Sequence, residues 1–201
     1  MTAGLLLGAA PAQAALTPAQ AGTILTLLAS FNVDAATIAR VRVALMGGTA
    51  APAGTISFMP GIQPAGGSVA PGAKDTPFNT FVISNNTASP VSIEGVTVTR
   101  TGTGEDSYLS GIELLDSAGT RVGRADTLDP SHQASIGGSF TLRAGESREL
   151  TVAGTVAARN RVHSGRTLSL EVVSINASAA LSGSLPIVGA AYTIDTSLKA
   201  Q

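Results

Sequence analysis

Short runs of apolar and β-branched residues alternate with polar turn residues from residue 76 almost to the end of the chain. The runs recur at intervals of roughly ten residues, with Gly, Asn, Asp, Ser and Pro between them, which is typical of an antiparallel β-sandwich. The expected strands are Phe78–Ser84, Val91–Thr99, Tyr108–Leu115, Thr120–Arg124, Ser139–Leu142, Ser147–Val156, Arg166–Ile175 and Ile187–Asp195. The pattern therefore predicts a mainly β domain over residues 55–201.

Residues 15–48 follow a helical period instead. Thr17, Pro18 and Gln20 supply an N-cap, a proline at the first helical position and a capping-box amide. Asp34 offers a second N-cap, and Gly47-Gly48 ends the second helix. The spacing predicts an αα-hairpin with apolar stripes. Its main apolar positions are Leu25, Leu28, Phe31, Ile38, Val41 and Leu45.

So small a hairpin buries little surface by itself. We expect its apolar stripes to dock on a partner or on another copy of the chain, or to cap one end of the β domain. A DNA-reading helix-turn-helix is not expected, since Arg40 and Arg42 are the only basic residues of the unit. Thr49–Gly54, made of small residues with Pro and Gly, is a linker between two units.

The first fourteen residues have the features of a clipped export signal. Gly4–Ala10 is a short apolar run, and Ala12-Gln13-Ala14 supplies the small-x-small pattern that a signal peptidase cuts, although Met1-Thr2-Ala3 lacks the usual basic residue. The run is far below the ~20 residues that a spanning helix needs. We therefore expect an extracellular or cell-surface protein without a transmembrane anchor.

Composition limits the core and the chemistry. Only 3% of the residues are aromatic and there is no Trp, so the core must come from aliphatic side chains. Its predicted members are Phe81, Ile83, Ile93, Val96, Val98, Ile112, Leu114, Phe140, Leu142, Leu150, Val152, Leu168 and Leu170. A net charge of −1 argues against a nucleic-acid partner, and the absence of Cys removes thiolate chemistry and disulfides.

The ordered motifs of the β domain resemble a known kind of module. They are Phe81–Ser84, Val91–Val98, Gly111–Asp116, Leu142–Ser147 and Leu150–Val152. They resemble the immunoglobulin-like sandwich modules of exported surface proteins from candidate-phyla-radiation bacteria, and Ser30–Ile38 is similar to a leader segment of such proteins. The resemblance implies a secreted or cell-surface protein, a component of a surface layer, filament or adhesin. It transfers no active-site residue.

Catalytic residues are scarce. The two histidines, His132 and His163, lie in polar, turn-like segments, and no Gly-x-Ser-x-Gly elbow is present. We therefore expect no enzyme and no cofactor other than calcium. The candidate calcium ligands are Glu105 and Asp106 in a flexible glycine-rich loop, with Asp126 and Asp129 closing the shell, the alternative being an ordinary polar loop.

The segment 159–166 is the only basic cluster of the chain. Arg159, Arg161, His163 and Arg166 fall between two predicted strands, where they would meet an acidic wall polymer, an acidic patch on a neighbour, or solvent alone. The sequence thus favours a non-enzymatic structural or adhesive surface module whose partners are other surface proteins or copies of itself. The alternative is a carbohydrate- or cell-wall-binding domain assisted by calcium.

Overall fold

The structure is a computed structural model, and it describes residues 18–31, 38, 41, 45 and 54–200. The chain divides into two compact units, Met1–Ala50 and Ala51–Gln201, called here the helical unit and the β unit. Strands hold 49% of the described residues, which confirms the mainly β class.

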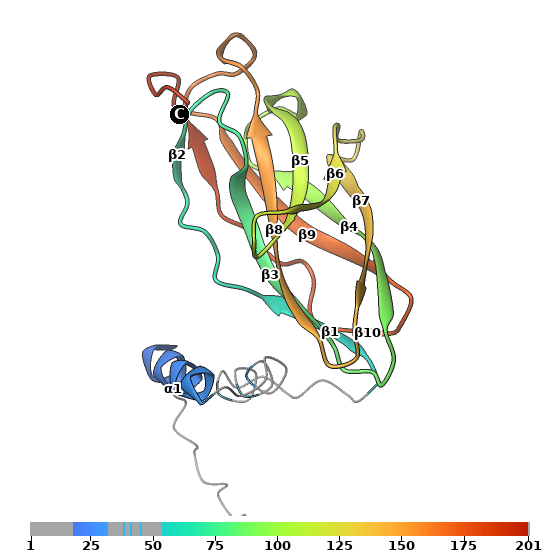
Figure 1. The fold of residues 1–201 in the computed structure, drawn as a ribbon. Coiled ribbons are helices and arrows are strands. Elements are labelled where there is room, and N and C mark those ends of the chain that lie inside the picture. The colour runs from blue at the N-terminus through green and yellow to red at the C-terminus, as the bar shows by residue number, and fades with distance from the viewer. Residues whose placement is uncertain (1–17, 32–37, 39–40, 42–44, 46–53, 201) are drawn as a thin grey trace, which may run out of the picture. The chain divides into compact units, whose positions relative to one another are not determined.

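Eleven strands form the β unit in the described part of the chain (Figure 1). They are β1 (Ile56–Pro60), β2 (Gly67–Val69), β3 (Thr76–Asn85), β4 (Val91–Thr101), β5 (Leu109–Asp116), β6 (Arg121–Ala125), β7 (Gln133–Leu142), β8 (Ser147–Val156), β9 (Thr167–Ala177), β10 (Leu181–Ser182) and β11 (Tyr192–Ile194). Two short 3-10 helices, Asp106–Tyr108 and Arg159–Arg161, lie between strands.

All eleven strands belong to one curled sheet in the order β10-β1-β3-β8-β5-β6-β7-β4-β9-β11-β2. The pairs β1–β10 and β2–β11 are parallel, and the other pairs are antiparallel. The sheet is therefore mixed, where the sequence pattern predicted antiparallel strands alone. The reason is that β2 and β10 have only three and two residues, too few to show any periodicity.

The core lies inside the curl and contains most of the predicted side chains. Twelve of the thirteen predicted core residues are buried, and they belong to one apolar cluster. Phe140 is the exception, because it is only partly buried against that cluster and the Arg148 guanidinium carbon lies 5.0 Å from its ring centroid. The period-two alternation of the long strands was thus enough to identify the inward face.

The first and last segments of the β unit run side by side in the same direction. Ile56 pairs with Leu181 at one end, and Val69 pairs with Ile194 at the other, so the partner is 125 positions later in both cases. At the second end, Gly67 N also donates to Ala191 O at 3.3 Å. Residues 56–69 and 181–194 therefore run parallel and are paired at their two ends, and we call the two segments together the terminal ribbon.

A seam between β3 and β9, which are not neighbours in the sheet, is closed by one side chain and one segment. The Asn79 Nδ2 donates to Leu170 O at 3.1 Å and to Ile187 O at 2.7 Å, and Asn79 is fully buried. Residues 183–191, called here the strap, lie along this seam: Ile187 bridges to Val172, and Ala190 N donates to Phe78 O at 2.6 Å. The strap thereby completes the curl.

In the helical unit, α1 spans Pro18–Ser30. Ile38, Val41 and Leu45 are also helical, in agreement with a second helix, whose bounds lie outside the described residues. The predicted signal peptide 1–14 lies outside them as well, and so does the linker 49–54 except for Gly54. Where the structure describes the chain, it contains no helix of the length and apolarity needed to cross a membrane.

Candidate functional site

Two loops of the β unit meet at a buried arginine. Arg100 ends the inward-facing series Val96, Val98, Arg100 of β4 and its side chain is 7% exposed. Its Nε lies 2.6 Å from Asp106 Oδ1. Its Nη2 lies 3.1 Å from His132 Nδ1, which also lies 2.8 Å from Asp106 Oδ2. The three side chains form a closed triangle that joins the 101–108 loop to the 126–132 loop.

The triangle changes the acidity of its carboxylate. Burial alone would raise the pKa of Asp106, but the hydrogen bonds from His132 and Arg100 and their positive charges outweigh it and hold that pKa below its usual value. His132 adopts a positive φ of 61°, uncommon for a residue with a side chain. Its carbonyl accepts from Arg100 N at 2.8 Å, so the backbone around it is held by the same arginine.

The four candidate calcium ligands are not brought together. Asp106 belongs to the triangle, and Asp126 Oδ1 lies 2.6 Å from Arg124 Nε. Asp129 Oδ1 accepts from the amides of Ser131 and Gln133 at 2.8 and 2.9 Å, which closes a turn within its own loop. The Glu105 carboxylate accepts from the Ser107 hydroxyl at 3.4 Å. No group of three or more metal-ligating side chains is found in the described residues, so the carboxylates act here as turn and ion-pair partners.

The triangle does not form a nucleophilic site. Of the two ring nitrogens of His132, only Nδ1 has hydrogen-bond partners among the described residues. With a proton it donates to Asp106 Oδ2, and without one it accepts from Arg100 Nη2. A Ser–His–acid arrangement needs a hydroxyl on the other ring nitrogen. The arrangement therefore positions loops and does not provide a general base for a neighbouring hydroxyl.

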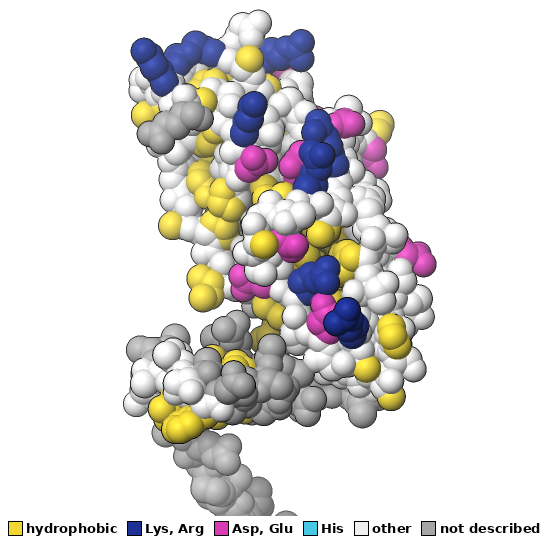
Figure 2. Space-filling view, in the orientation of Figure 1, with side chains coloured by type: hydrophobic (Ala, Val, Ile, Leu, Met, Phe, Trp, Pro, Cys, Tyr) yellow, Lys and Arg dark blue, Asp and Glu magenta, His cyan; other side chains and the backbone are white. Residues whose placement is uncertain are grey.

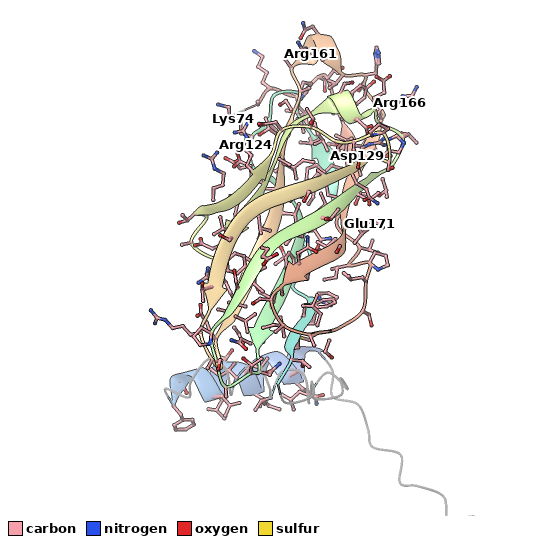
Figure 3. The ribbon with its side chains drawn as sticks, turned by 90° about the vertical axis from the view of Figure 1, so that its right-hand side faces the viewer. Lys74, Arg124, Asp129, Arg161, Arg166 and Glu171 are labelled. Atoms are coloured by element: carbon pink, nitrogen blue, oxygen red, sulfur yellow. The ribbon has the colours of Figure 1, made fainter. Side chains whose placement is uncertain are left out.

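The predicted basic cluster lies at one end of the β unit and is larger than the sequence indicated. Arg159, Arg161, His163 and Arg166 are all exposed on the connection between β8 and β9. Lysines and arginines gather at the end of the molecule that carries the C-terminus (Figures 1 and 2). Figure 3 labels Lys74, Arg161 and Arg166 toward this same end. We call this end the C-terminal pole.

The predicted docking residues of the helical unit differ in exposure. Phe31 is 72% exposed, whereas Leu25, Leu28, Ile38, Val41 and Leu45 are half-buried. Leu27, which the helical stripe omits, is 57% exposed and lies in the last turn of α1, four positions before Phe31, which directly follows the helix. Docking itself stays a prediction.

Sequence reasoning missed Arg100 and His132, although one signal was available. Strict alternation from Val96 and Val98 places Arg100 on the buried face of β4, and a buried guanidinium requires a carboxylate. The contribution of Lys74 and Lys199 to the basic end had no such signal, because it depends on three loops meeting in space.

Comparisons with known proteins do not assign a family. No family model matches the chain, and no curated protein matches it. A family 123 glycoside hydrolase from Clostridium perfringens is similar over 70% of this chain, with 11% identity and a TM-score of 0.31, and this chain spans 27% of that enzyme. Self-complemented MyfA, the major subunit of Myf fimbriae from Yersinia enterocolitica, solved with galactose, is similar over 69% of this chain and 95% of its own, with 18% identity and a TM-score of 0.24. Both TM-scores are below 0.5, so neither likeness carries an argument about this chain.

Proposed function

We propose that the protein is a non-enzymatic structural module, secreted to the cell surface, whose β unit carries mechanical load between its two poles. The observation that supports this role is the terminal ribbon. The chain enters the β unit at one pole, before β1, and leaves it at the other, after β11 (Figure 1). A pull on the two ends therefore acts along the strands.

The direction of this pull determines how the ribbon resists it. Residues 56–69 are drawn toward one pole and residues 181–194 toward the other, so the two parallel segments must slide past each other. In sliding, the hydrogen bonds at Ile56–Ser57 and at Gly67–Val69 are loaded together, whereas in peeling they would break one after another. Each bond contributes only about 1 kcal/mol, so simultaneous loading is what gives mechanical strength.

The same observations support the immunoglobulin-like sandwich as the finer description of the fold. β6 and β7 share a single register pair, Arg124 with Gly137, which supports a sheet that folds over at this point into two layers. The ribbon crosses between them: β1 pairs with β3 in one layer, and β2 reaches β9 through β11 in the other. Strands that switch sheets in this way are a known device of sandwiches.

Pulling along two axes tests the load-bearing role, and the absence of native Cys allows unique thiol handles. The axial variant carries Thr55→Cys and Lys199→Cys. The matched variant carries Thr55→Cys and Ala180→Cys, which peels the ribbon from one end. Single-molecule pulling at one loading rate should give an unfolding force several-fold higher for the axial variant, because forced unfolding follows the barrier along the pulling direction. Equal forces, or a weaker axial variant, would contradict the proposal.

Secretion needs its own measurement. Expressed with its native N-terminus in a bacterial host, the protein should reach the medium or the outer cell surface, where a protease added to intact cells degrades it. Retention inside protease-treated cells would contradict the surface location without bearing on the mechanical role.

A cell-wall-binding domain is the second candidate, and the unneutralised cations of the C-terminal pole favour it. Binding to purified peptidoglycan, compared with and without a chelator, distinguishes a calcium-assisted domain from an electrostatic one. Chelation should leave binding unchanged, because the candidate carboxylates already have protein partners.

A further inference from the structure

We infer that the C-terminal pole of the β unit binds a linear polyanion whose repeating groups are phosphates or carboxylates. This inference concerns attachment and is independent of the load-bearing role. It begins with three segments far apart in sequence, 70–75, 157–166 and 195–200. They supply the exposed cations Lys74, Arg159, Arg161, Arg166 and Lys199.

Hydrogen bonds join these three segments into one surface. Gly72 N donates to Val156 O and Ala157 O, at 3.2 and 3.0 Å, which attaches the first segment to the second. Gly165 N donates to Ile194 O at 2.8 Å, and Arg159 Nη2 donates to Leu198 O at 2.7 Å, which attaches the second to the third. The cations are therefore held on one surface.

The charge of this surface is not neutralised by ion pairs, in contrast to four of the five other arginines of the β unit, Arg143 being the exception. Arg100, Arg121, Arg124 and Arg148 each form an ion pair. No cation of the pole forms one in the described part of the chain. The protein has 12 Lys and Arg in all. Both lysines and three of the arginines lie at this pole, where they have no ion-pair partner among the described residues.

The acidic groups nearby do not cancel this excess. The three segments contain Asp75 and Asp195, and the Asp195 carboxylate accepts from the amide and hydroxyl of Ser197 at 2.8 and 2.6 Å. These hydrogen bonds and, to a smaller extent, the charge of Arg159 lower the pKa of Asp195, so Arg159 is compensated in part. On the adjacent loop, Asp106 is already paired with Arg100, and Glu105 is the remaining acid. Figure 3 also labels Asp129 toward this end, where its carboxylate accepts from the amides of Ser131 and Gln133. A surplus of exposed guanidinium and ammonium groups remains.

The arrangement fits a polymer better than a small anion or a single-stranded nucleic acid. The cations come from separate segments and do not converge on one point, so a small anion would meet only one or two of them. A chain of regularly spaced anions can meet several at once and release their counterions. Stacking of bases would need exposed aromatic rings, but Tyr108 is buried and Tyr192 is half-buried.

The experiment uses the full chain and three probes: long-chain polyphosphate, polygalacturonate and neutral dextran. The test variant carries Arg161→Gln and Arg166→Gln. The control carries Arg143→Gln, an exposed arginine without an ion pair on the turn between β7 and β8, at the opposite end of those strands. Affinity is measured by titration at several salt concentrations, and melting curves confirm that each variant is folded.

We expect the wild-type chain to bind at least one of the two polyanions and not dextran. The test variant should lose affinity by about tenfold or more at low salt, and its salt dependence should be less steep by one to two counterions, since each contact releases about one. The control should bind within twofold of the wild type. The preferred probe identifies the anion as phosphate or carboxylate.

Three results would overturn the inference: no binding to either polyanion, an equal loss in the control variant, or tighter binding to an oligonucleotide or to anionic lipid vesicles than to both polymers. None of them affects the pulling experiment, so failure here and failure of the load-bearing role are distinguishable.

Discussion

Arg100 is the side chain on which two loops of the β unit depend. It is 7% exposed, and its guanidinium binds Asp106, His132 and the Gly102 carbonyl. A buried charge is stable only when it is paired and hydrogen-bonded. Asp106 supplies the negative charge, so the conformation of both loops depends on its ionisation.

Replacing Asp106 with Asn should destabilise the protein by about 1–3 kcal/mol at pH 7, because it leaves the Arg100 charge without its counter-ion. The folded-state pKa of Asp106 is depressed, so its contribution is fully present above the unfolded pKa of about 3.9 and is lost as the pH falls through the folded value. The difference between wild type and variant should therefore shrink below about pH 4. Urea unfolding at neutral and acidic pH measures it.

Asp126→Asn is the matched control for this measurement. Its side chain is 73% exposed and its partner Arg124 is 46% exposed, so solvent screens the pair and the loss should stay below about 1 kcal/mol. If both variants lose the same free energy, or if the Asp106 difference persists at low pH, the triangle does not stabilise the loops.

At the scale of elements, the strap can lie along the seam only because Gly189 has no side chain. A Cβ at Gly189 would lie 2.4 Å from Leu170 O and 2.5 Å from Phe78 O, the carbonyls of the two strands that the strap joins. A Cβ at Gly137, on the middle of β7, would meet nothing within 4 Å. The glycine is needed in the strap because two backbones approach it from opposite sides.

Gly189→Ala should therefore cost several kcal/mol, on the order of the 3 kcal/mol typical of backbone strain and overpacking, whereas Gly137→Ala should change stability by less than about 1 kcal/mol. Denaturant midpoints of the two variants give the comparison. Similar midpoints would mean that the strap moves away from the seam at little cost.

The buried side chain of Asn79 closes the same seam through hydrogen bonds. Its Nδ2 donates to two carbonyls, and its Oδ1 is buried without a partner in the described residues. Asn79→Asp removes both donors and places a charge against carbonyl oxygens, so it should destabilise more than Asn79→Ala, which only leaves the carbonyls unpaired. Melting temperatures from thermal unfolding rank the two variants. A lower melting temperature for Asn79→Ala than for Asn79→Asp would contradict this order and would show that water replaces the amide.

For the helical unit, we predict that the full chain associates with itself through exposed apolar side chains. Leu27 in the last turn of α1 and Phe31 directly after the helix have exposed apolar side chains, so self-association of the full chain should decrease when both are changed to Ser. Sedimentation at high concentration measures it, with Thr23→Ser as a control on the same helix. A wild-type chain that is monomeric at all concentrations would leave docking to a different protein only, and would contradict self-association.

At the scale of the whole molecule, the two units should behave independently. Limited proteolysis should cut first between the helical unit and the β unit, near residues 46–54, and the β fragment should melt at the same temperature as it does in the intact chain. Mass spectrometry locates the cut. A first cut inside residues 56–194, or a fragment with a lowered melting temperature, would contradict independence.

The sequence reveals those parts of the molecule that depend on local pattern. Ser147–Val156 was predicted with the bounds that β8 has, because ten residues of alternation specify a buried face. By contrast, β10 is two residues long and its partner lies 125 positions away, so no local pattern encodes it. The site divides in the same way: alternation along β4 could have indicated Arg100, but only the folded chain places Lys74 beside the 157–166 segment.

The terminal ribbon also constrains how the gene for this protein can change in length. Residues 56–69 and 181–194 have equal numbers of residues and keep register at both ends. An insertion or deletion within one segment shifts one end of the ribbon unless the other changes with it or bulges. Related genes should therefore vary in length at the loop tips, and length changes in the two ribbon segments should occur together.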